Sequence, residues 1–89
     1  MRKLSITHDG LKFLDRLDAK QFRQVVRRIL ALATDPTPND SIHMEGSDYR
    51  RTDQGEYRIV YSFDDETVFI AVIGKRNDDE VYRKMDRKR

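Results

Sequence analysis

The stretch YRIVYSFDDETVFIAVI, from Tyr57 to Ile73, decides the fold. It contains two apolar runs, Tyr57–Phe63 and Val68–Ile73, which are rich in aromatic and β-branched residues. The acidic segment Asp64-Asp65-Glu66 joins the two runs. Runs of this composition on either side of a short polar turn predict a β-hairpin. We therefore expect two paired strands in this part of the chain.

Alternation within the first run separates two chemically different faces, because successive side chains of a strand point to opposite sides of the sheet. One face carries Tyr57, Ile59, Tyr61 and Phe63. The other face carries Arg58, Val60 and Ser62. We expect the aromatic face to pack on helices. The Arg58 face should then be the open side of the sheet, or a concave groove along it.

Two shorter strands are predicted before this hairpin. Ser41–Glu45 and Tyr49–Thr52 are the candidates, and Asp53-Gln54-Gly55-Glu56 has the composition of a turn. Closely spaced strands that are joined by short turns favour an antiparallel meander. We therefore expect an antiparallel sheet over the second half of the chain.

The first third of the chain combines one strand with a helical hairpin. Lys3–Thr7 alternates and predicts a short strand at a sheet edge, and Leu11–Leu17 has helical spacing. Asp18 and Gln21 form a capping-box pattern at the start of a second helix. The apolar stripe of that helix is Phe22, Val25, Val26, Ile29, Leu30 and Ala33. The prolines within 34–40 end it.

A final short helix is predicted from about Asp78 to Lys88, with Asp78 or Asp79 as its cap. A sheet with one apolar face must cover that face, and the second helix is the natural cover. The sequence thus predicts an α+β fold in a single domain, residues 1–89. In this fold an N-terminal strand and a helical hairpin pack on an antiparallel sheet, followed by a short C-terminal helix.

Composition excludes several functional classes. The chain has no cysteine, so disulfides, thiolate metal sites and cysteine nucleophiles are excluded. Two histidines without matched spacing predict no metal site, and no cofactor motif is present. The N-terminus lacks the apolar run of a signal peptide, and no stretch is long enough for a membrane span. We therefore expect a cytoplasmic protein.

The candidate functional residues are cationic. Arg58 lies within an apolar strand, where a guanidinium must face solvent, pair with a carboxylate or bind an anion. Arg76 follows Gly74 at a strand end, and Lys75 lies between them. Either Arg50 or Arg51, but not both, should point to the Arg58 face.

Tyr82 lies in the predicted last helix, where a tyrosine is either a packing residue or a functional one. A functional role requires neighbouring cations, which favour the ionised form of a phenol. That requirement is met if Arg58, Arg76 and either Arg50 or Arg51 converge on Tyr82.

These segments resemble the RelE branch of the RelE/ParE toxin superfamily. The similarity rests on Tyr57-Arg58-Ile59-Val60-Tyr61, on Val72-Ile73-Gly74-Lys75-Arg76 and on Glu80-Val81-Tyr82. It is strong over Tyr49–Tyr82 and is limited to architecture in the N-terminal third. The resemblance implies a microbial-RNase-like fold, a toxin of a type II toxin–antitoxin pair, and a cognate antitoxin as partner. The last helix, Asp78–Lys88, is expected either to dock the antitoxin or to pack its apolar residues Val81 and Met85 on the sheet.

The resemblance also implies a ribosome-dependent endoribonuclease that cuts mRNA in the ribosomal A site. The family's functional positions correspond to Arg58, Arg76 and Tyr82, with RNA contacts from Arg50, Arg51 and Lys75. The family places lysines where this chain has Arg50-Arg51, and arginine cannot act as a base because it stays protonated. The implied chemistry is metal-independent attack by the RNA 2′-hydroxyl. We expect Arg58, helped by Arg50 or Arg51, to stabilise the phosphoryl charge and Arg76 to stabilise the leaving group. The base is either Tyr82 or the environment of the 2′-hydroxyl that the ribosome supplies.

Two other functions remain compatible with the sequence. The ParE branch shares the fold and acts on DNA gyrase, but it lacks the cluster of Arg58, Arg76 and Tyr82. A non-catalytic module that binds RNA or the ribosome would inhibit translation without cutting mRNA. Cleaved mRNA distinguishes the ribonuclease from both of these alternatives.

Overall fold

The computed structural model describes residues 1–87, with the side chain of Asp78 left out. Its elements are β1 (Lys3–Ile6), α1 (His8–Asp15), α2 (Ala19–Thr34), β2 (Ile42–His43), β3 (Arg50–Gln54), β4 (Tyr57–Phe63), β5 (Thr67–Lys75), a 3₁₀ turn (Arg76–Asp78) and α3 (Glu80–Arg87). The expected α+β fold is confirmed, and β4 has the predicted bounds. The predicted strand Ser41–Glu45 is shorter in the structure, where only Ile42–His43 pairs as β2.

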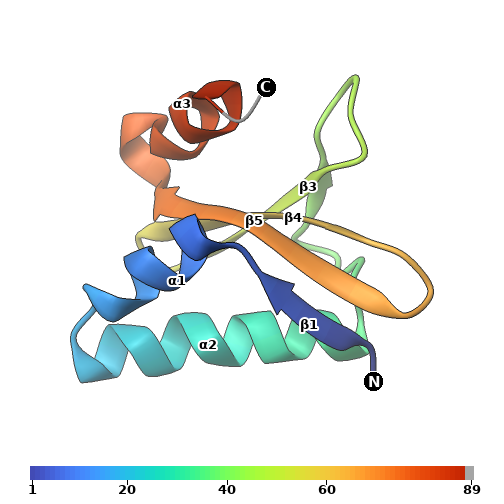
Figure 1. The fold of residues 1–89 in the computed structure, drawn as a ribbon, viewed down its shortest axis with the longest axis horizontal. Coiled ribbons are helices and arrows are strands. Elements are labelled where there is room, and N and C mark those ends of the chain that lie inside the picture. The colour runs from blue at the N-terminus through green and yellow to red at the C-terminus, as the bar shows by residue number, and fades with distance from the viewer. Residues whose placement is uncertain (88–89) are drawn as a thin grey trace.

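The sheet has the strand order β1-β5-β4-β3-β2 and is mixed (Figure 1). The meander from β2 to β5 is antiparallel, as expected. β1 lies at the sheet edge, as expected, and pairs parallel to β5, a direction that the sequence did not predict. The alternation of Lys3–Thr7 predicts a strand but carries no information about its direction. The sequence pattern therefore could not distinguish the two arrangements.

The main core lies between α1, α2 and one face of the sheet. Tyr57, Ile59 and Tyr61 of β4 are buried there against residues such as Phe13 of α1 and Ile29 of α2. The Tyr61 hydroxyl donates a hydrogen bond of 2.6 Å to the Pro36 carbonyl, which satisfies a polar atom that burial would otherwise penalise. The expectation that the aromatic face packs on the helices is confirmed.

α3 covers part of the opposite face, on the other side of the sheet from α2 (Figure 1). Val60 and Val72 are fully buried against Val81 of α3, with Met44 and Met85 packed around them. The prediction that the Arg58 face is the open side of the sheet is therefore wrong for its centre. Val60 and Val72 are apolar residues on that face, and burying them requires a cover. That cover brings α3 close to Arg58.

The helix ends follow local hydrogen bonding. The N–H of Gln21 donates to Asp18 Oδ1 at 2.8 Å, so the predicted cap of α2 is confirmed. α1 starts earlier than predicted because Thr7 caps it, accepting a hydrogen bond from the Gly10 N–H. α3 starts at Glu80, after Asp79, whose φ of 54° breaks the helical path from the 3₁₀ turn. The predicted end at Lys88 lies outside the described residues.

Candidate functional site

The β3–β4 hairpin brings Arg58 face to face with Asp53. Gly55 and Glu56 form its two-residue turn, and Gly55 has a φ of 59° that suits glycine at this position. The resulting register places Asp53 directly opposite Arg58 on the same face. Arg58 Nε donates to Asp53 Oδ1 at 2.8 Å, and Nη2 donates to Oδ2 at 3.2 Å. This two-point contact fixes the orientation of the guanidinium.

Tyr82 of α3 is the second contact of Arg58, on the face of the sheet that α3 covers. Arg58 Nη1 donates to the Tyr82 hydroxyl at 3.2 Å, and the guanidinium carbon lies 6.0 Å from the ring centroid. Gly74 allows this approach, since a Cβ at that position would lie 3.1 Å from the Glu80 Cβ at the start of α3. The structure thus brings together two residues that are 24 positions apart in the sequence.

Asp53 is a member of the site that the sequence reasoning missed, because Asp53 was assigned to a turn. The hydrogen bonds from Arg58 hold the pKa of the Asp53 carboxyl below its usual value. The positive charges of Arg58, Arg51 and Arg76 act in the same direction, against the effect of burial. A turn at Gly55-Glu56 makes positions 53 and 58 symmetric partners, so the hairpin spacing was the signal that could have revealed the pair.

The register also separates the two arginines of β3. Arg51 pairs with Val60 and therefore lies on the Arg58 face. Arg50 pairs with Tyr61 on the helix-covered face, and its side chain donates to the Ser41 hydroxyl at 2.8 Å. The sequence predicted that at most one arginine would face the site, and the structure places Arg51 there.

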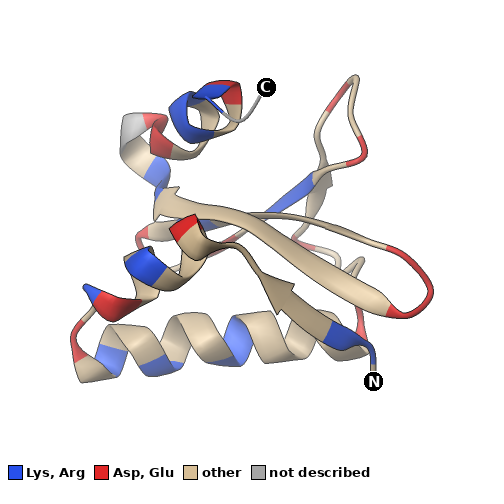
Figure 2. Cartoon of the chain, in the orientation of Figure 1, with Lys and Arg blue, Asp and Glu red and all other residues tan. Residues whose placement is uncertain are grey.

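The end of β5 separates the side chains of Arg76 and Lys75. Arg76 starts the 3₁₀ turn, its side chain is exposed, and its charge acts on Asp53. Lys75 pairs with Tyr57 and so lies on the face of the sheet that carries α1. The cationic segments near α3 lie at the opposite end of β5 from the acidic β4–β5 turn (Figure 2).

The site opens onto a cavity of about 410 Å³ between α3 and the loop after β2. Its walls include Tyr82 and Met85 from α3 together with Met44 and Tyr49. His43 lies apart from Arg58, in β2, where its Nε2 is 2.6 Å from the Ser47 carbonyl oxygen. Among the side chains of residues 1–77 and 79–87, no group of three His, Asp or Glu is arranged to hold a metal ion.

The remaining donors of the Arg58 guanidinium define what the site can do. Asp53 accepts from two of its five N–H donors and the Tyr82 hydroxyl accepts from a third. Two N–H donors are left over, and a guanidinium is well suited to bind phosphate. They belong to the same group that contacts the Tyr82 hydroxyl. The arrangement suits binding of an RNA phosphate next to a phenolic hydroxyl.

Removing the Asp53 charge should weaken the fold in a pH-dependent way. The lowered pKa means that Asp53 stabilises the fold fully above its unfolded pKa of about 4. That contribution is lost as the pH falls through the lower pKa that the carboxyl has in the folded state. Because Asp53 is one-third exposed, we expect Asp53→Asn to cost about 1 kcal/mol at pH 7 and less than that at pH 3, below the unfolded pKa. Urea unfolding at both pH values measures this, and an equal cost at both would contradict it.

Comparison with known proteins identifies the family. The sequence profile described as "ParE toxin of type II toxin-antitoxin system, parDE" matches residues 4–80. The chain belongs to this toxin family. The expected membership of the RelE/ParE superfamily is thereby confirmed. No curated protein sequence matches the chain significantly.

Solved structures of RelE toxins share the fold of this family member. The archaeal RelE–RelB complex from Pyrococcus horikoshii is 26% identical, with a TM-score of 0.77 over 86% of this chain and 97% of that chain. An arginine double mutant of E. coli RelE in the free state is 21% identical, with a TM-score of 0.81 over 98% and 96%. The RelBE2 toxin–antitoxin complex from Mycobacterium tuberculosis is 22% identical, with a TM-score of 0.70 over 84% and 98%.

Proposed function

We propose that this toxin is a ribosome-dependent endoribonuclease that cleaves mRNA in the ribosomal A site. The observation that carries the proposal is the Arg58 guanidinium, which Asp53 orients and which donates a hydrogen bond to the Tyr82 hydroxyl. The fold shared with RelE toxins supports it. A cognate antitoxin is the proposed protein partner, because the RelE relatives were solved in complexes with RelB. The cytoplasm, where ribosomes translate, is the proposed location.

The proposed reaction uses the RNA's own 2′-hydroxyl as nucleophile, so that attack on phosphorus produces a 2′,3′-cyclic phosphate and a free 5′-hydroxyl. Tyr82, as the phenolate, takes the proton from the 2′-hydroxyl, and water gives a proton to the leaving 5′-oxygen. Arg58 and Arg51 stabilise the charge that develops on the phosphoryl oxygens, and Arg76 stabilises the leaving oxygen. Electrostatic stabilisation of this kind is commonly the largest catalytic contribution. No histidine is assigned a role, so the rate depends on positioning of the mRNA by the ribosome.

The two neighbouring arginines of β3 offer a matched test. Arg51→Ala should lower the cleavage rate at least about tenfold, because Arg51 lies on the Arg58 face and its charge favours phosphate binding. Arg50→Ala should lower the rate less than about threefold, because Arg50 lies on the other face and acts on the fold through Ser41. Both rates are measured with purified ribosomes and a defined mRNA, after equal folded fractions have been verified. A larger loss for Arg50→Ala would contradict the assigned face.

Inhibition of DNA gyrase is the second candidate function, because the matching family profile is that of ParE toxins. A supercoiling assay with purified gyrase tests it directly. Inhibition of supercoiling by the wild type, with mRNA left intact on the ribosome, would favour gyrase. Cleaved mRNA with normal supercoiling would favour the ribonuclease.

A further inference from the structure

The second half of β5 lacks a neighbouring strand on the side where β1 pairs with its first half. β1 pairs with β5 only from Thr67 to Ile70, and β5 continues to Lys75. Unpaired backbone groups at a sheet edge are prone to bind other strands unless side chains or another element cover them. The free groups of Ala71, Ile73 and Lys75 therefore require partners from elsewhere in the chain.

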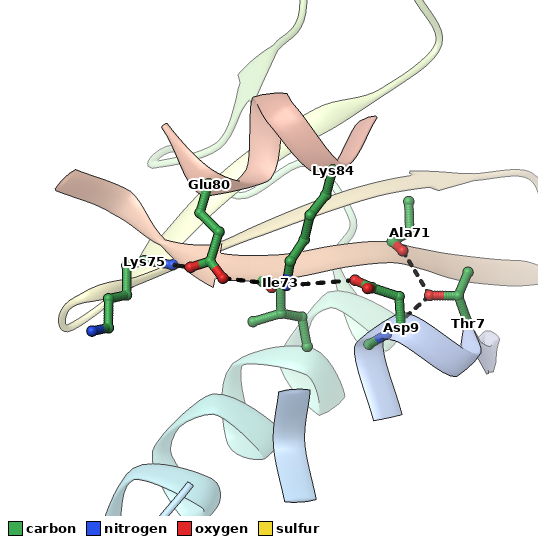
Figure 3. Close-up of polar contacts among 8 residues, drawn as sticks. Thr7, Asp9, Ala71, Ile73, Lys75, Glu80 and Lys84 are labelled. Atoms are coloured by element: carbon green, nitrogen blue, oxygen red, sulfur yellow. Dashed lines mark hydrogen bonds and ion pairs between the residues drawn. The ribbon is translucent and has the colours of Figure 1, made fainter. Parts of the chain in front are cut away.

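Side chains provide these partners (Figure 3). The Thr7 hydroxyl donates to the Ala71 carbonyl at 2.6 Å. Lys84 Nζ donates to the Ile73 carbonyl at 2.8 Å, and the Lys75 N–H donates to the Glu80 carboxylate at 2.8 Å. Two of the three covering side chains, Glu80 and Lys84, belong to α3. The helix that carries Tyr82 is thus bound to the edge of the sheet by polar contacts.

Lys84 is at the centre of this network. Its Nζ lies 3.6 Å from Asp9 Oδ2 of α1 and 3.5 Å from Glu80 Oε1, and it also sits 4.7 Å from the Phe13 ring centroid. The Lys84 side chain is only 12% exposed. Asp9 Oδ2 is buried and has no hydrogen-bond partner within residues 1–87, so the Lys84 charge is its compensation. Lys84 therefore links α3 to both α1 and β5.

The apolar packing of α3 holds the helix on the sheet without fixing its orientation. Val81 is the buried residue of this eight-residue helix, and it packs with Val60 and Val72 of the sheet. Tyr82 and Met85 are half-buried against the same cluster. Apolar contacts are non-directional. The rotation of α3 therefore depends on the directed polar contacts around Lys84.

We propose that Lys84 is a positioning residue for Tyr82, holding α3 so that the Tyr82 hydroxyl stays beside Arg58. The expected effect on the cleavage rate rests on the proposed ribonuclease function. The expected effect on the position of α3 rests on the Lys84 contacts, which Figure 3 shows. Lys84 acts through Tyr82 and not on the RNA, because its Nζ is directed to Asp9, Glu80 and Ile73.

Lys84→Met tests this by removing the charge while keeping the length of the side chain. We expect kcat for mRNA cleavage to fall at least about tenfold, with KM for the programmed ribosome changing less than about twofold. In a Tyr82→Phe background the same substitution should lower the rate by less than about twofold further, because both changes act on one group. Lys84→Arg should recover part of the rate. Arg87→Met, an exposed position of α3, is the control for loss of one positive charge.

Hydrogen exchange provides a readout that does not depend on activity. Lys84→Met should speed exchange of the α3 amides at least about tenfold while β4 stays protected. If Lys84→Met does not fold, Asp9→Asn weakens the same network and should give a smaller change in the same direction. Unchanged α3 exchange, or full additivity with Tyr82→Phe, would overturn the inference. A different outcome would overturn the proposed function instead: faster α3 exchange in Lys84→Met, with a wild type that cuts no mRNA. Lys84 would then still be the residue that holds Tyr82 in place.

Discussion

Arg58→Ala is expected to lower ribosome-dependent mRNA cleavage by roughly 10²–10³-fold, the effect of losing a donor that stabilises transition-state charge. The substitution removes the positive charge of the site and the partner of the Tyr82 hydroxyl. Arg58→Lys keeps the charge but cannot make the two-point contact, so its rate should lie between those of the wild type and the alanine variant. Single-turnover cleavage of a defined mRNA measures all three rates.

The same substitution has a structural effect that must be separated from the catalytic one. Arg58→Ala leaves the Asp53 carboxylate without its two hydrogen bonds, so the free energy of unfolding should fall by about 1–2 kcal/mol. Arg27→Ala, at an exposed position of α2, is the matched control and should change neither quantity. A rate loss for Arg58→Ala that merely equals its loss of folded protein would contradict a catalytic role.

Tyr82→Phe has the second largest expected effect. Loss of an acid–base group typically lowers a rate by about 10²–10⁴-fold, and we expect a loss near the lower end of that range. Because the ring is retained, its contacts with Met85 and Met44 persist, and the fold should lose no more than about 1 kcal/mol for one hydrogen bond.

A control for this substitution is available within the same cavity. Tyr49 lines it together with Tyr82, but the hydrogen bond with Arg58 belongs to Tyr82. Tyr49→Phe should therefore change the cleavage rate less than about threefold. Equal losses for Tyr49→Phe and Tyr82→Phe would show that the Tyr82 hydroxyl has no special part in the reaction.

The fold was predictable where a local pattern determines it. The alternation of Tyr57–Phe63 and the acidic turn after it predict β4 with its observed bounds, and Asp18 predicts the start of α2. The parallel pairing of β1 was not predictable, since alternation does not specify strand direction. α3 was expected as a helix, but its place over Val60 and Val72 depends on tertiary packing that no local pattern encodes.

The candidate site was predictable in its members and less so in its geometry. Arg58, Arg76 and Tyr82 stand out by residue type and by family resemblance. The register decides that Arg51 and not Arg50 shares their face, and it makes Asp53 the partner of Arg58. A shift of one residue in the β3–β4 pairing would exchange these positions. The turn at Gly55-Glu56 therefore sets the composition of the site as well as the path of the chain.

The central claim is that Arg58 and Tyr82 form a site that cuts mRNA on the ribosome. The most direct measurement maps the 5′ ends of a defined mRNA after incubation with purified ribosomes and the wild type, Arg58→Ala or Tyr82→Phe. The account predicts cleavage at the A-site codon by the wild type, only when ribosomes are present, with loss in both variants. Intact mRNA in the presence of folded wild-type protein, or equal cleavage by all three proteins, would contradict it.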